Sequence, residues 1–222
     1  MPQRSIVGMM SPKTTEHLKR AETAIEKLKE LLNGCKVVDD LRNLILIGTI
    51  DQLIEHHASV LLLIRSGKVG SAFALSRSIV EGMYRGLWLN FCATDDEIKG
   101  FEQEDKLRAN MVEMADAIDD KYRAEGFFAD LRKRAWPHLC SYAHTGMLQL
   151  GRRFTGHALI PNYGDGEIVE ITTSVTTCIL TMTSKFLARL NLGPEALAAE
   201  KLIETFGPAS RRRNAQSGGS AK

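Results

Sequence analysis

A single buried helix is indicated by residues 68–93, KVGSAFALSRSIVEGMYRGLWLNFCA. Apolar side chains recur around most of the circumference of this helix, a pattern typical of a helix that others surround. Gly67 stands just before the stretch, and a capping-box pattern begins just after it with Thr94 and Glu97. We therefore expect a central helix with further helices packed around it.

Helical periodicity continues through the rest of the chain, and no strand pair is predicted. The other expected helices cover residues 12–33, 39–66, 94–119, 127–134, 137–150, 167–192 and 193–206, with a loop at 151–166. The fold class is therefore all-α, a single bundle of about seven or eight helices. Its expected organisation is a flexible N-terminus at 1–10, the bundle at 11–207 and a disordered basic tail at 208–222.

Composition and charge exclude several kinds of protein. The 222 residues are 44% hydrophobic and 25% charged, as in an average soluble domain, which excludes a disordered chain. Arg211, Arg212, Arg213 and Lys222 supply four of the positive charges in a net +2. The remaining chain is therefore slightly acidic, which is not the surface of a general nucleic-acid binder.

Cysteine spacing and hydrophobic runs favour a cytoplasmic protein. The four cysteines show no CxxC pairing, so neither a zinc ribbon nor a thioredoxin-type site is predicted. Residues 1–10 lack the apolar core of a secretory signal. The uncharged helical run at 171–184 is shorter than the ~20 residues that span a membrane. We expect a reducing compartment, the cytoplasm, and no membrane segment.

Three charged residues form one stripe on the expected central helix. Arg77, Glu81 and Arg85 are spaced at i, i+4 and i+8, and Trp88 falls in the same sector. One interpretation is a surface ladder of salt bridges, each worth about 0.3–0.5 kcal/mol. The other is a half-buried catalytic or binding cluster that faces a groove, with Trp88 as one wall.

His57 lies on the apolar face of the helix expected at 39–66. A histidine there is most often a core residue with one hydrogen-bond partner, and Glu81 from the next helix is the candidate. A carboxylate beside the ring would raise the pKa of His57. The functional interpretation makes His57 a binding residue.

The segment 136–146, WPHLCSYAHTG, places polar aromatic side chains beside an expected core stripe. That stripe consists of Leu139, Ala143, Met147 and Leu150. Tyr142 and His144 lie at its two margins, and Arg152 and Arg153 follow the expected helix end. Such side chains are common in pocket walls and also in ordinary helix packing. His144 is the candidate general base, and the other three are candidate binding residues.

Motifs for metals and nucleotides are missing from the sequence. The chain has no HExxH, no ExxH pair of the di-iron type, no GxGxxG or GxxxxGKS loop and no GxSxG elbow. We therefore expect neither a metal ion nor a cofactor.

Two blocks of the chain resemble a known family. Residues 63–89, LIRSGKVGSAFALSRSIVEGMYRGLWL, and 142–153, YAHTGMLQLGRR, are similar to an uncharacterised bacterial family of helical proteins. More distantly, the chain resembles the HEPN superfamily and abortive-infection proteins. That resemblance implies a dimeric, metal-independent ribonuclease with an Arg-x(4–6)-His motif and a link to phage defence or stress. Two pairs have this spacing, Arg132 with His138 across Pro137, and Arg152 with His157 in the expected loop.

Two functions stay open at this point. The first is a non-enzymatic module that forms a homodimer through an apolar helix face, or binds a partner protein or small molecule near Trp88. The second is a HEPN-like ribonuclease acting on RNA. There His144 would deprotonate the ribose 2′-hydroxyl, and one or more arginines would stabilise the phosphorane. The candidates are Arg77, Arg85, Arg152 and Arg153. We favour the first function because neither Arg-His pair fits the ribonuclease motif well.

The two functions share one geometric expectation. The helices that carry His57, Arg77 with Glu81, and His144 should pack together around one cleft.

Overall fold

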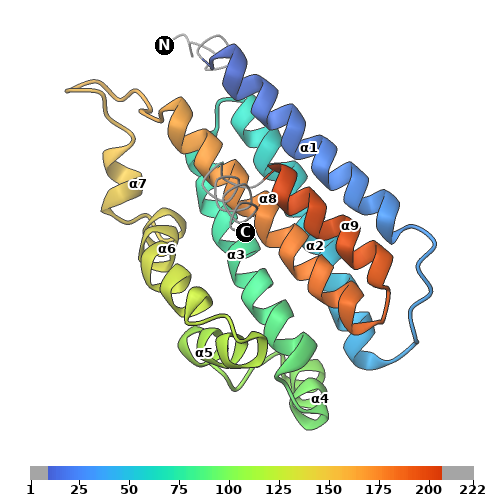
Figure 1. Cartoon of the computed structure of the whole chain (residues 1–222). Coiled ribbons are helices and arrows are strands. Elements are labelled where there is room, and N and C mark those ends of the chain that lie inside the picture. The colour runs from blue at the N-terminus through green and yellow to red at the C-terminus, as the bar shows by residue number, and fades with distance from the viewer. Residues whose placement is uncertain (1–9, 207–222) are drawn as a thin grey trace, which may run out of the picture.

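The structure, a computed structural model, describes residues 10–206. Within them it has nine helices and no strand, which confirms the all-α bundle (Figure 1). The helices are α1 Pro12–Leu32, α2 Leu41–Arg65, α3 Val69–Phe91, α4 Asp95–Glu104, α5 Met111–Tyr122, α6 Phe127–Ala143, α7 Met147–Gly151, α8 Asp165–Arg189 and α9 Gly193–Phe206. Of the expected flexible N-terminus only Met10 lies in this range, and the expected basic tail lies outside it. No helix in the described range is long and apolar enough to span a bilayer.

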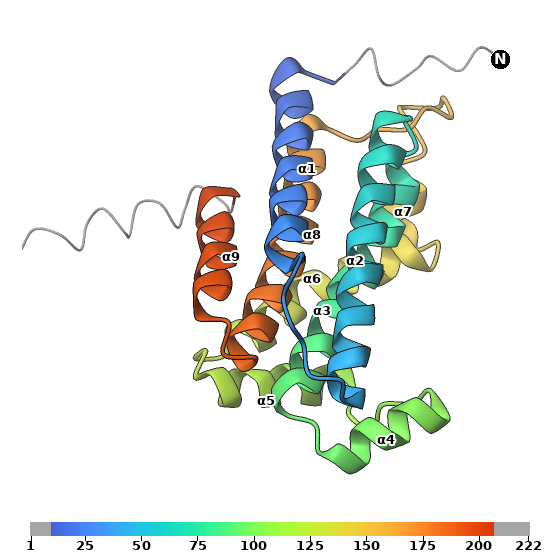
Figure 2. The same ribbon diagram turned by 90° about the vertical axis from the view of Figure 1, so that its right-hand side faces the viewer.

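The central position of α3 is as the sequence predicts. α3 packs against α2 and α8 on one side and against α5 and α6 on the other, while α1 and α9 lie outside α8 (Figures 1 and 2). Ile79, Tyr84 and Leu87 of α3 are fully buried. Burying a large apolar side chain contributes about 1.5–3 kcal/mol. Contacts around α3 are therefore a major source of stability.

The helix expected at 94–119 is two helices, and that expectation was wrong. α4 ends at Glu104, and the next residue, Asp105, has the left-handed φ of 51°. A second capping box then starts α5, because Asn110 accepts from the amide of Glu113 while the Glu113 carboxylate accepts from the amide of Asn110. The sequence pattern Asn110-x-x-Glu113 is the one that predicts such a capping box.

The break expected at Trp136-Pro137 does not occur. α6 runs through Pro137, whose ring removes one backbone hydrogen bond from the helix. Pro137 and Lys133 are both exposed, so the carbonyl that loses its amide partner can bind water. Trp136 therefore shares a helix with the residues before it.

The helix expected at 137–150 is interrupted after Ala143. His144 ends α6, and Thr145 takes a left-handed φ of 57° before α7 begins at Met147. Of the expected core stripe, Leu139 is buried, but Met147 is 78% exposed and Leu150 is also exposed. The turn rotates the second half of the stripe out of the core.

α6 is fixed to the rest of the bundle by an acidic side chain from α5. The carboxylate of Asp119 accepts from the amides of Phe128 and Ala129 at 2.9 and 2.8 Å. Tyr84 of α3 donates its hydroxyl to the Phe128 carbonyl at 2.8 Å. These bonds satisfy polar groups at the start of α6 and set its position against α3.

Candidate functional site

α3 and α6 run antiparallel along one seam. The Tyr84 ring lies 6.1 Å from Phe128 near the start of α6, and the Phe73 ring lies 5.0 Å from Tyr142 near its end. The turn after α6 therefore comes back to the first half of α3. This register places the side chains of Arg77 and Glu81 opposite the middle of α6.

Arg77 connects the two helices. Its guanidinium lies 4.9 Å from the centre of the Trp136 ring, a cation–π distance. Its NH1 is 2.8 Å from Nε2 of His144, and its NH2 is 3.6 Å from Oε2 of Glu81. Because a guanidinium can only donate, Nε2 of His144 must be the unprotonated nitrogen. Nε2 of His144 is therefore the acceptor of this hydrogen bond.

Glu81 lies between two arginines. Its Oε1 is 2.6 Å from NH2 of Arg85, so the i, i+4, i+8 stripe forms as one ion-pair chain. The side chains of Arg77 and Glu81 are only 24% and 22% exposed, which argues against a fully solvated ladder. A hollow of about 310 Å³ opens beside Glu81 and Arg85, and Asp105, Lys106 and Asn110 line its other side.

A third arginine lies at the same level of the seam. Because α3 and α6 are antiparallel, each step forward along α3 corresponds to a step back along α6. Arg77 lies against Trp136, so Glu81, four residues later, lies opposite Arg132, four residues earlier. The Tyr84–Phe128 pair fits the same register. The Nε atoms of Arg77 and Arg132 are buried and have no acceptor among the described residues. We name this set the seam cluster: Arg77, Glu81, Arg85, Arg132, Trp136 and His144.

The turn that carries His144 depends on close packing. Gly146 approaches Ser141 so closely that an added Cβ would lie 2.9 Å from its Cα. The Ser141 hydroxyl accepts from the Leu148 amide, and the Gly146 amide donates to the Ser141 carbonyl at 2.7 Å. These contacts fix where α6 ends, and thereby the position of His144.

His57 and Trp88 do not join the seam cluster. Trp88 is 5% exposed and belongs to the core, so it does not wall the charged stripe; Trp136 lies against Arg77 instead. His57 is 2% exposed, and its Nε2 is 2.9 Å from Oγ1 of Thr176 on α8. Glu81 is therefore not its hydrogen-bond partner. Burial lowers the pKa of His57 to about 4 instead of raising it.

Tyr142, Arg152 and Arg153 lie farther along the seam, toward the start of α3. Tyr142 is buried with its ring against Phe73. Arg152 forms an ion pair with Glu167 of α8, and Arg153 is exposed in the loop that follows α7. The structure thus gathers Arg77, Glu81, Arg85 and His144, and places these three residues outside that group.

Some residues of this site were not predicted from the sequence. They come from the unbroken helix α6 and from the connection between α4 and α5. Arg132 and Trp136 are four residues apart, so they share one helix face only if the helix extends beyond its expected end at residue 134 to include Trp136. Lys106 and Asn110 reach the hollow because the chain breaks between α4 and α5. Among residues 10–206 no group of three potential metal ligands comes together.

Comparison with known families gives one match. The model of the family of unknown function DUF6988 matches residues 50–208. This chain belongs to that family. The comparisons with curated proteins and with solved structures give no match.

The DUF6988 match covers the whole seam cluster. It begins within α2 and includes α3 through α9, and both sequence blocks, 63–89 and 142–153, lie inside it. α1 and the first part of α2 lie outside the matched region. The expectation of an uncharacterised family is confirmed at this level. The similarity to the HEPN superfamily stays a prediction.

Proposed function

We propose that this protein is a non-enzymatic binding module that takes a phosphate-bearing anion at the seam cluster. One observation carries the proposal. Arg77 and Arg85 both pair with the Glu81 carboxylate, and the buried Nε atoms of Arg77 and Arg132 have no acceptor within the described residues. Unused donors of this kind favour an anionic ligand with several acceptor oxygens.

The geometry suits phosphate because the arginines are held in place before binding. The Trp136 ring and the His144 nitrogen fix the plane of Arg77, so little side-chain freedom is lost when a ligand binds. The half-buried position of the pair strengthens its electrostatic interactions relative to water. The hollow beside Glu81 and Arg85, whose lining also includes Asp105 and Lys106, is the open space next to the cluster that a ligand could enter.

A metal-independent ribonuclease of the HEPN type is the second candidate. The observation that favours it is the contact of a histidine with an arginine at a partly exposed site. A general base, however, needs a free lone pair, and that of His144 Nε2 accepts from Arg77. The ribonuclease proposal therefore requires His144 to leave Arg77 when RNA binds.

Pyrophosphate is the probe that tests the first proposal. Saturating ligand at about 100 times Kd stabilises a protein by about 2.7 kcal/mol, which raises Tm by roughly 5–10 °C at this size. We expect Arg85→Gln to weaken binding tenfold or more, because hydrogen bonds to charged groups contribute about 1.5–3 kcal/mol.

The matched control is Arg65→Gln, which removes an arginine paired with Glu22 on another part of the bundle. It should leave the pyrophosphate affinity unchanged. RNA incubated with the wild type in EDTA should stay intact. Equal effects of the two substitutions on pyrophosphate binding would contradict the binding site, and cleaved RNA would favour the ribonuclease.

A further inference from the structure

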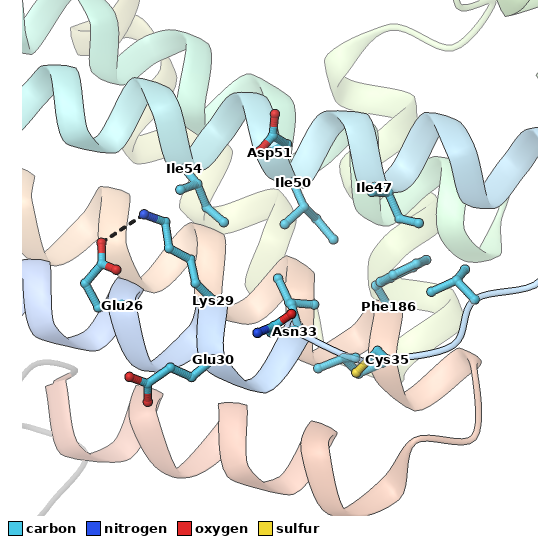
Figure 3. A pocket seen from close by; sticks show the side chains of 13 residues that line it. Glu26, Lys29, Glu30, Asn33, Cys35, Ile47, Ile50, Asp51, Ile54 and Phe186 are labelled. Atoms are coloured by element: carbon cyan, nitrogen blue, oxygen red, sulfur yellow. Dashed lines mark hydrogen bonds and ion pairs between the residues drawn. The ribbon is translucent and has the colours of Figure 1, made fainter.

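A second and larger hollow lies away from the seam cluster, between α1, α2 and α8. Its volume is about 590 Å³, a size typical of ligand pockets. Figure 3 shows Ile47, Ile50 and Ile54 pointing from α2 into this space, with Phe186 of α8 at one end. Ile47 is 39% exposed, so the apolar wall is open to solvent.

The rim of this cavity is acidic. Glu26, Glu30 and Asp51 line it together with one cation, Lys29. Lys29 forms an ion pair with Glu26 at 2.9 Å (Figure 3). Within residues 10–206, Glu30 and Asp51 form no ion pair. These carboxylates on the rim favour an occupant that is apolar at its tip and basic around it.

A segment of the same chain has these properties. α7 and the loop after it expose large apolar side chains, with Leu159 at 74%. We name this segment the finger, and its exposed apolar residues are Met147, Leu148, Leu150, Phe154, Leu159 and Ile160. An exposed apolar group of this size on a soluble domain marks an interaction site.

The finger has a defined shape and a basic character. Thr155 and Ala158 form a bridge that folds the loop back, and the Thr155 hydroxyl donates to the Ile160 carbonyl. Arg153 and His157 are exposed on the finger, and residues 143–163 contain no Asp or Glu. The finger therefore complements the acidic rim in charge and the isoleucine wall in polarity.

The finger and the cavity of one chain lie apart. The loop after α7 is at the upper end of the bundle, whereas the α1–α2 connection beside the cavity is in its lower half in both views (Figures 1 and 2). We propose that the finger of one copy occupies the α1–α2–α8 cavity of a second copy. The occupant is thus a second chain of this protein, and the contact does not depend on the anion site.

Cys35 allows a direct test, because it lines the cavity (Figure 3). We expect Leu159→Cys and Ile160→Cys, under mild oxidation, to form a disulfide with Cys35 of another copy. The product is a covalent dimer on a non-reducing gel, and peptide mapping should identify the Cys35 linkage. Adding Cys35→Ser should abolish it. The matched control is Val112→Cys, at an exposed apolar position on α5, which should give no Cys35 linkage.

Oligomeric mass provides the second measurement. Light scattering of the wild type should give at least twice the 24.6 kDa of one chain, and Leu159→Asp should reduce the mass to that of one chain. Since Leu159 is exposed, the circular dichroism of this variant should match that of the wild type. A wild type of monomeric mass overturns the proposal, and so does the lack of a Cys35 linkage from both finger positions.

Discussion

Arg77 and His144 are 67 positions apart in the sequence, yet Arg77 NH1 lies 2.8 Å from His144 Nε2. The contact joins the middle of α3 to the last turn of α6, and it fixes the tautomer of the imidazole because only the arginine can donate. His144 is thus an acceptor that orients Arg77. In this arrangement it is a positioning residue for the guanidinium.

Substitution of His144 should separate an acceptor role from a catalytic one. His144→Gln keeps an oxygen that can accept from Arg77, so we expect pyrophosphate affinity within about threefold of wild type. His144→Leu removes the acceptor and should weaken binding about tenfold, since bonds to charged groups contribute roughly 1.5 kcal/mol or more. Isothermal titration calorimetry measures both. Equal losses in the two variants would contradict the acceptor role.

The pH dependence of stability should reflect His57. Thr176 Oγ1 donates to the Thr172 carbonyl, so His57 Nε2 must donate to Thr176. Burial disfavours the charged form of this ring. The pKa of His57 falls from 6.5 in the unfolded chain to about 4 in the folded chain. Between these values the unfolded chain binds a proton that the folded chain does not. The contribution of His57 to the free energy of unfolding is therefore complete above pH 6.5, and it falls by about 3 kcal/mol as the pH drops to 4.

Urea unfolding of His57→Leu between pH 4 and 7 checks this assignment. The variant should lose most of the slope that the wild type shows in that window. His17, whose pKa burial also lowers, supplies a smaller remaining slope. His56→Gln, at the neighbouring and less buried position, is the control and should keep the wild-type slope. An unchanged slope in His57→Leu would rule the assignment out.

Asp119 should be among the most sensitive acidic residues of the chain. Asp119→Ala leaves the amides of Phe128 and Ala129 without their acceptor at a buried position. We expect a loss of about 2–3 kcal/mol in the free energy of unfolding. The neighbouring Asp120 is exposed, so Asp120→Ala should stay within about 0.5 kcal/mol of wild type. Urea titrations of both variants test this, and similar losses would refute the capping role.

Gly146 should tolerate no side chain. In Gly146→Ala the new methyl meets the backbone of Ser141, which should cost about 1–3 kcal/mol of stability. The turn would also shift His144, so pyrophosphate affinity should fall with it. Gly151→Ala is the matched control, because a Cβ there meets nothing within 4 Å. A Gly146→Ala variant as stable as Gly151→Ala would contradict the packing argument.

The parts of the fold that depend on periodicity could be predicted from the sequence. The all-round apolar pattern of 68–93 predicts a buried helix, and α3 is that helix. The i, i+4, i+8 spacing of Arg77, Glu81 and Arg85 likewise predicts their ion pairs, since helix geometry alone brings them together.

The parts that depend on packing between helices could not be predicted. The partner of His57 is Thr176 because α8 packs on α2, which no local pattern specifies. Trp136 and Arg132 were missed because a proline usually ends a helix. α6 continues because Pro137 and Lys133 are both exposed, so the Lys133 carbonyl that lacks an amide partner can bind water. Thr145 adopts a left-handed φ that β-branched residues rarely take, so the end of α6 was also missed.

The most direct test of the anion site compares two arginines of α6. Arg132 lies at the level of Glu81 in the seam, while Arg134 is exposed and paired with Asp130. Arg132→Gln and Arg134→Gln each remove one positive charge from α6, at positions two residues apart. Pyrophosphate titrations measure the affinity of both variants. The proposed site predicts that Arg132→Gln weakens binding tenfold or more and that Arg134→Gln leaves it within about twofold. Equal affinities of the two variants, or a wild type that binds no pyrophosphate, would contradict it.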